Sequence, residues 1–160
     1  MLTKQDLIAI LIKEYSTTLR VMRAFPPDKK DFKPHERSQE AIRLVSTFIF
    51  EMYLLESYLF GDQIDRSRFS AYKPENMEAA IADFEKESSQ VIERMDILSD
   101  DDFKKPIQFA GREFSADEFT LMMIHDQIHH RGQLSVYVRM AGGKVPSIYG
   151  PSADDTSTNL

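Results

Sequence analysis

Four stretches of this 160-residue chain repeat apolar residues at three- and four-residue steps, and this periodicity constrains the fold more than any other feature. The expected helices cover residues 4–24, 39–60, 75–98 and 116–140. Prolines or glycines follow the first, second and fourth of them, where helices commonly end. Four helices of about 20 residues joined by moderate loops predict an all-α fold, a four-helix bundle.

A short segment before the fourth helix has a different pattern. Residues 107–109 and 112–114 alternate apolar and polar side chains around Ala110-Gly111, which predicts a small β-hairpin. Ser115 and Glu118 then form the pattern of a capping box, in which each side chain satisfies a backbone N–H of the other residue. The start of the fourth helix is therefore the most clearly marked boundary in the chain.

The expected domain organisation is simple. We expect residues 1–150 to form one domain, and residues 151–160, which are small and polar, to form a flexible tail. The second helix carries apolar residues on two faces, so it is either central or meets both the core and a partner subunit.

Composition excludes several classes of function. The chain has no cysteine, so disulfides, thiolate metal sites and cysteine nucleophiles are excluded, and a cytoplasmic location is favoured. The net charge is −6 and the basic residues are scattered, so we expect no nucleic-acid binding. No apolar stretch approaches the roughly 18 residues that a membrane span needs, so we expect no membrane partner.

The chemistry of the chain is concentrated in the fourth helix, in the stretch HDQIHHRGQ. His125 and His129 lie four residues apart, so both imidazoles can point to one metal ion from one helical face. The row continues through Met122, Val136 and Met140, which predicts that the pair points inward or lies at the rim of the core. The alternative is a hydrogen-bonded polar layer without metal.

Three neighbouring residues are candidates for supporting roles. His130 points about 100° away from His129, so we expect it to meet solvent, a loop or a second subunit. Arg131 is a candidate for a salt bridge with a carboxylate on a neighbouring helix. Asp126 and His130 are candidate proton carriers near the site.

The segment from His125 to the tail, with its paired histidines, H-H-R-G-Q run and Gly-x-x-Pro segment, resembles the DinB family. The resemblance extends over most of the chain, including the hairpin and the helix cap that follows it. It implies a four-helix bundle that is commonly a homodimer. It also implies nickel, zinc or iron held by one histidine of the second helix and two of the fourth, spaced as His125 and His129. Some members are thiol S-transferases or isomerases acting with low-molecular-weight thiols.

The second helix departs from that pattern because it contains no histidine. The position of the family's third histidine corresponds to Thr47, whose hydroxyl is a poor metal ligand. Glu51 lies one turn further on the same face and could complete a two-histidine, one-carboxylate site. Alternatively, Glu51 accepts hydrogen bonds from the histidines or pairs with Arg131, and no metal binds.

Three functional hypotheses follow. The first is a metal-dependent enzyme acting on an unknown small molecule, by thiol S-transfer or hydrolysis. The second is a non-catalytic, dimeric binding or stress-related protein with a degenerate metal site. The third is a structural dimer module, favoured by the doubly apolar second helix.

Overall fold

The computed structural model describes residues 2–65 and 67–155. This part of the chain contains four long helices, α1 (Lys4–Arg23), α2 (Ala41–Phe60), α4 (Met77–Ile97) and α5 (Ala116–Met140). Shorter elements join them: η1 (Pro27–Lys29), α3 (Ser67–Ala71), η2 (Asp102–Lys104) and the hairpin β1 (Pro106–Phe109) and β2 (Arg112–Ser115). The predicted all-α four-helix bundle with a small hairpin before its last helix is confirmed.

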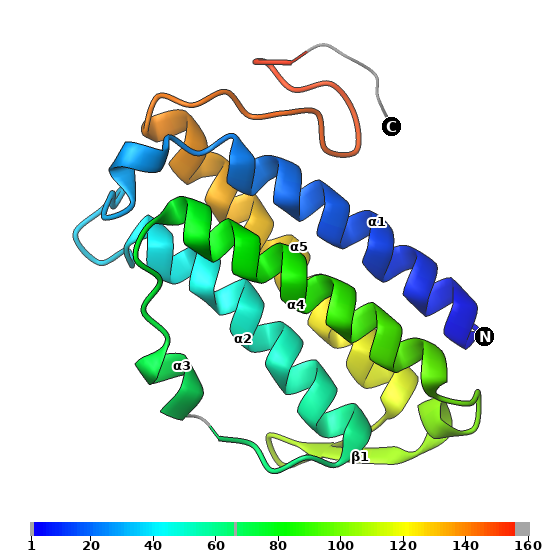
Figure 1. Cartoon of the computed structure of the whole chain (residues 1–160). Coiled ribbons are helices and arrows are strands. Elements are labelled where there is room, and N and C mark those ends of the chain that lie inside the picture. Colours follow the sequence, from blue (N-terminus) through cyan, green and yellow to red (C-terminus); the bar gives the residue numbers. More distant parts are fainter. Residues whose placement is uncertain (1, 66, 156–160) are drawn as a thin grey trace.

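Each long helix packs mainly against two others. α1 and α2 both lie against α4 and α5, so α1 and α2 occupy opposite corners of the bundle. α2 and α4 run in the same direction, because residues 61–76, which include α3, return along the outside of the bundle (Figure 1). Within the described residues, no helix combines the length and apolar character that crossing a membrane requires.

The ends of α2 and α4 differ slightly from the predicted boundaries. α2 begins at Ala41, after Glu40, and Ser38 lies in the preceding turn. Gly61 ends α2 in the left-handed conformation, with a φ of 70° that glycine adopts without strain. α4 begins at Met77, and the Asn76 side chain caps it by accepting from the backbone N–H of Ala79 at 2.8 Å.

The hairpin and the helix after it follow the sequence pattern closely. Ala110 and Gly111 form the turn, both with positive φ, at 51° and 77°. Ser115 and Glu118 form the predicted capping box at the start of α5. Because β2 runs directly into this cap, the hairpin fixes the point at which α5 enters the bundle.

The core is one continuous apolar cluster between the four long helices. Its centre is aromatic: the ring of Phe84 on α4 makes edge-to-face contacts with Tyr15 of α1 and Phe48 of α2, at centroid distances of 5.9 and 6.2 Å. Phe48 and Phe84 are fully buried. This packing fixes the rotation of α2 about its own axis, and so determines which α2 side chains face α5.

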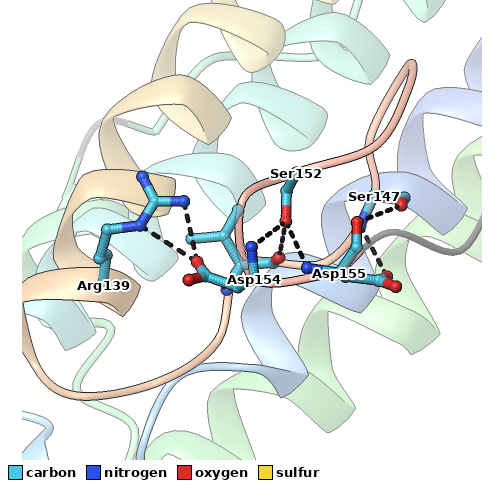
Figure 2. Close-up of polar contacts among 6 residues, drawn as sticks. Arg139, Ser147, Ser152, Asp154 and Asp155 are labelled. Carbon is cyan, nitrogen blue, oxygen red and sulfur yellow. Dashed lines mark hydrogen bonds and ion pairs between the residues drawn. The ribbon is translucent and has the colours of Figure 1, made fainter.

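The segment after α5 folds back over α1 and α5 (Figure 1). Val145 is buried, so this segment packs on the bundle. Asp154 accepts from Arg139 at 2.8 Å, and the Ser152 hydroxyl caps the turn by accepting from the backbone N–H of Asp155 at 2.9 Å (Figure 2). Of the tail expected at residues 151–160, Ser152, Asp154 and Asp155 form hydrogen bonds, and residues 156–160 lie outside the described part.

Candidate metal site

The orientation of α5 decides which of its polar residues can form a site. Its buried residues recur at three- and four-residue steps and define the side that faces the core: Phe119, Thr120, Met123, Ile124, Gln127, Arg131, Leu134 and Val138. His125 and His129 lie on the opposite side and are exposed. The expectation that this pair points inward or lies at the rim of the core is therefore wrong. Val136 and Met140, which extended the row, are 52% and 57% exposed.

His130 occupies the flank of α5 that faces α2. Its Nε2 lies 3.1 Å from Oε1 of Glu51 and 3.8 Å from Oδ1 of Asp126. One ligand atom from each of these three residues lies within 4.8 Å of the other two. His130 was expected to meet solvent, a loop or a second subunit; it meets Glu51 instead, because one step along a helix turns it about 100° from exposed His129 toward α2.

Gln133 connects the two adjacent histidines. Its Oε1 lies 3.2 Å from His130 Nδ1, and its Nε2 lies 2.8 Å from His129 Nε2. An amide oxygen accepts and an amide nitrogen donates, so the proton of His130 belongs on Nδ1 and its Nε2 is left facing Glu51. The ring of Phe48 packs edge-on against the His130 imidazole at 6.2 Å. Gln133 and Phe48 thus hold the His130 ring with Nδ1 toward Gln133 and Nε2 toward Glu51.

Glu51 is the buried member of the cluster. Its side chain is 4% exposed, against 19% for His130 and 48% for Asp126. Apart from the His130 contact, neither of its oxygens has a hydrogen-bond partner in the described part of the chain. A buried carboxylate without donors is energetically costly, so this side chain is suited to binding a cation.

The electrostatics of the pair follow from this burial. Burial raises the pKa of Glu51 to about 7, against the opposing effect of the His130 hydrogen bond. The hydrogen bond to Glu51 raises the pKa of His130 to about 9, and burial opposes this rise. Without a metal, the two groups therefore retain a proton near neutral pH, which a metal ion would displace.

The remaining candidates have structural roles. The Thr47 hydroxyl donates to the backbone carbonyl of Arg43 at 3.1 Å, one turn earlier in α2. Arg131 is buried and pairs with Glu14 of α1 at 2.7 Å, which confirms its expected salt bridge to a neighbouring helix. Because Arg131 is committed to α1, it is not the partner of Glu51.

The sequence identified Glu51 as a possible ligand, but it placed Asp126 and His130 near the site only as proton carriers and not as ligands. Asp126 and His130 have the same four-residue spacing as His125 and His129, so the spacing alone could not separate the two pairs. The two pairs are separated by the buried side of α5, which includes Gln127 and Arg131: Asp126 and His130 lie nearer to this side than His125 and His129 do.

The arrangement has the chemistry of a divalent-metal site. Two carboxylates and one imidazole from facing helices are a recurrent ligand type in helical bundles. Ligands that share one zinc-sized ion lie roughly 3–4 Å apart, close to the separations found among these three residues. Three protein ligands also leave coordination positions for water or substrate.

Comparisons with known proteins agree with this architecture. The family model described as DinB family matches residues 1–159. The protein named uncharacterized protein YrdA of Bacillus subtilis (strain 168) is 37% identical over 57 residues, which are 36% of this chain and 34% of that protein. The match thus spans about a third of the length of this curated relative.

Solved structures share the whole fold at low sequence identity. A DinB-like protein from Bacillus cereus matches with a TM-score of 0.81 at 19% identity, over 92% of this chain and 98% of that chain. The DinB-like protein YjoA of Bacillus subtilis matches with a TM-score of 0.72 at 19% identity, over 89% and 96% of the two chains. YfiT from Bacillus subtilis, described as a probable metal-dependent hydrolase with an unusual four-helix bundle topology, matches with a TM-score of 0.66 at 12% identity, over 88% and 89%.

Proposed function

This chain belongs to the DinB family, and we propose that it is a metal-dependent enzyme whose ion is held by Glu51, Asp126 and His130. The observation that carries the proposal is the buried Glu51 carboxylate, which has no other donor in the described residues and lies 3.1 Å from an oriented imidazole. The neighbour YfiT, which shares the fold, is described as a probable metal-dependent hydrolase.

The donor set narrows the choice of metal. Two carboxylate oxygens and one imidazole nitrogen suit zinc and iron(II), and nickel is the third candidate. When bound, such an ion supplies Lewis acidity and lowers the pKa of a water molecule that it binds. The ligands expected at His125 and His129 are replaced in this proposal by Asp126 and His130, since the two exposed histidines are directed away from Glu51.

The three residues would contribute differently. Glu51 supplies negative charge from the buried side and limits the approach of water there. His130 presents Nε2 because Gln133 holds its Nδ1 proton. Asp126, which is 48% exposed, lies at the open side, where a substrate would enter. The site is therefore polar and accessible on one side only.

Hydrolysis is the reaction class that we favour. It needs an activated water and a polarised carbonyl or phosphoryl oxygen, both within the chemistry of such a site. Thiol S-transfer, expected from the family resemblance, would use the same three residues with a thiol in place of water.

An activity screen of the zinc-, iron- and nickel-loaded protein tests this proposal. Activated esters, amides and phosphoesters probe hydrolysis, and a low-molecular-weight thiol with an electrophilic acceptor probes S-transfer. We expect one class to be turned over, and we expect Glu51→Gln and His130→Ala each to lower kcat/KM about 100-fold or more.

His125→Ala is the matched control, because it removes an imidazole from the same helix at an exposed position outside the cluster. It should retain wild-type activity. Turnover that is unaffected by Glu51→Gln and His130→Ala would contradict the proposed site. No turnover by any loaded form would favour the non-catalytic hypothesis.

Two further expectations stay predictions. The homodimer expected from the sequence is supported by the family resemblance and by the apolar residues on two faces of the second helix. The cytoplasmic location is supported by the absence of cysteine alone.

A further inference from the structure

A second hollow lies on the other side of α2 from Glu51, between α2, α3 and α4. Its volume is about 160 Å³, which is small for a drug-sized ligand and suits a compact molecule. Four aromatic rings line it: Phe50 and Tyr53 of α2, Phe69 of α3 and Tyr72 just after α3. Phe50 and Phe69 lie 4.7 Å apart, centroid to centroid. The aromatic walls thus come from two separate elements.

The wall contributed by α4 is acidic. Asp83 and Glu87 lie four residues apart on the same face of α4 and both line the hollow. Asp83 accepts a hydrogen bond from the Tyr72 hydroxyl at 2.7 Å, a neutral partner that leaves its charge uncompensated. No basic side chain of the described residues forms a salt bridge with either carboxylate. Two carboxylates without a salt bridge therefore face the aromatic rings, and the Arg68 side chain, which also lines the hollow, pairs with neither of them.

Two of the aromatic rings already have a guanidinium group over one face, and one of these groups, that of Arg68, lines the hollow. The guanidinium of Arg68 lies 4.4 Å from the centre of the Tyr53 ring, and that of Arg43 lies 4.5 Å from the centre of the Phe69 ring. Arg68 is exposed, so its charge is screened by solvent. The faces of these rings are thus placed where a positive charge is stabilised by the π electrons.

We propose that this hollow, which we call the aromatic-acidic pocket, binds a small organic ammonium cation. Aromatic faces and carboxylates together stabilise an alkylated ammonium, which is both positively charged and apolar at its surface. A metal ion would find carboxylate ligands on the α4 wall alone, and an anion would be repelled by Asp83 and Glu87. The pocket is independent of the proposed metal site, because it faces α3 and α4 while Glu51 faces α5.

Choline is a suitable probe, because its quaternary nitrogen cannot coordinate a metal. Its neutral isostere 3,3-dimethyl-1-butanol has the same shape without the charge. Isothermal titration calorimetry on the full chain should give a choline Kd of about 0.1–1 mM. The neutral isostere should bind at least tenfold more weakly, because it lacks the charge that both walls recognise.

Substitutions on α4 locate the binding. Glu87→Gln and Asp83→Asn should each weaken choline binding at least tenfold, and Asp83→Asn keeps an acceptor for Tyr72. Glu93→Gln is the matched control, since Glu93 is on the same helix but lines a different hollow, on the α1 side. It should leave the Kd unchanged, and circular dichroism checks that all three variants fold.

Three outcomes would overturn the proposal. The first is no choline binding at 10 mM. The second is equal affinity for choline and the neutral isostere. The third is choline binding that persists in Glu87→Gln and Asp83→Asn but is lost in His130→Ala, which would put the ligand at the metal site.

Discussion

At the scale of single residues, one proton is central to the candidate metal site. Glu51 and His130 lie 3.1 Å apart, and both have pKa values raised above those of the unfolded chain, to about 7 and about 9. The folded protein without metal therefore holds more protons than the unfolded chain over this range. By linkage, its free energy of unfolding must fall as the pH rises.

We therefore predict that the free energy of unfolding of the metal-free protein depends on pH. The stability contributed by the proton that His130 holds is fully present below pH 6.5 and is lost as the pH rises through about 9, so the free energy of unfolding should fall by about 2 kcal/mol over that window. Urea unfolding in the presence of a chelator measures it. Glu51→Gln removes the counter-charge, so its stability should vary much less between pH 6.5 and 9. An equally steep fall in this variant would show that other groups are responsible.

The role of a residue could be predicted from the sequence where its position allowed only one role. Glu51 was identified as a possible ligand because the Thr47 hydroxyl is a poor metal ligand and Glu51 lies one turn further on the same face of the helix. The role of Gln133 was not predictable, because its effect depends on two ring nitrogens whose directions are fixed only in the folded helix. Phe48 likewise reads as a core residue, and its contact with His130 appears only once α2 and α5 are packed.

At the scale of elements, helix ends were easier to predict than helix rotation. The capping boxes at Thr3 and Ser115 are local interactions, readable from four residues. The rotation of α5 was misjudged because this helix is apolar on more than one side: Val136 and Met140 extend the exposed histidine row as if it were a buried one. α3 was missed because it has five residues and no apolar period of its own.

A buried ion pair between Arg131 and Glu14 joins α5 to α1. The buried guanidinium of Arg131 pairs with Glu14 at 2.7 Å, and donates to the hydroxyl of Thr18 at 3.3 Å and to that of Tyr149. Glu14→Gln keeps the shape of the side chain but leaves Arg131 buried without a counter-charge. We expect it to lower the free energy of unfolding by about 3 kcal/mol.

Glu85→Gln provides the comparison for this variant. It removes the pair between Arg23 and Glu85, whose side chains are 55% and 54% exposed, and it should cost less than about 1 kcal/mol. Chemical denaturation at constant pH measures both variants. If Glu14→Gln costs no more than Glu85→Gln, the Arg131 contact does not stabilise the bundle.

At the scale of the whole molecule, the order of the helices places the two sites on different sides of α2. α5 contributes Asp126 and His130 on one side, while α3 and α4 form the aromatic-acidic pocket on another. The sequence predicted the four helices and the hairpin, but not which helices are neighbours. Which helices are neighbours depends on the path of the connection from α2 to α4, which includes α3 and runs back along the outside of the bundle (Figure 1). No local sequence pattern encodes this path.

The central claim is that Glu51, Asp126 and His130 bind one divalent metal ion. The most direct measurement is the metal content of untagged protein after loading with zinc, iron(II) and nickel in turn, compared among wild type, His130→Ala, His125→Ala and His129→Ala. We predict one ion per chain for at least one metal in the wild type and in the two variants at exposed histidines, and loss of that ion in His130→Ala. Wild-type protein that stays empty under all three loadings, or a metal retained in His130→Ala and lost in His129→Ala, would contradict the account.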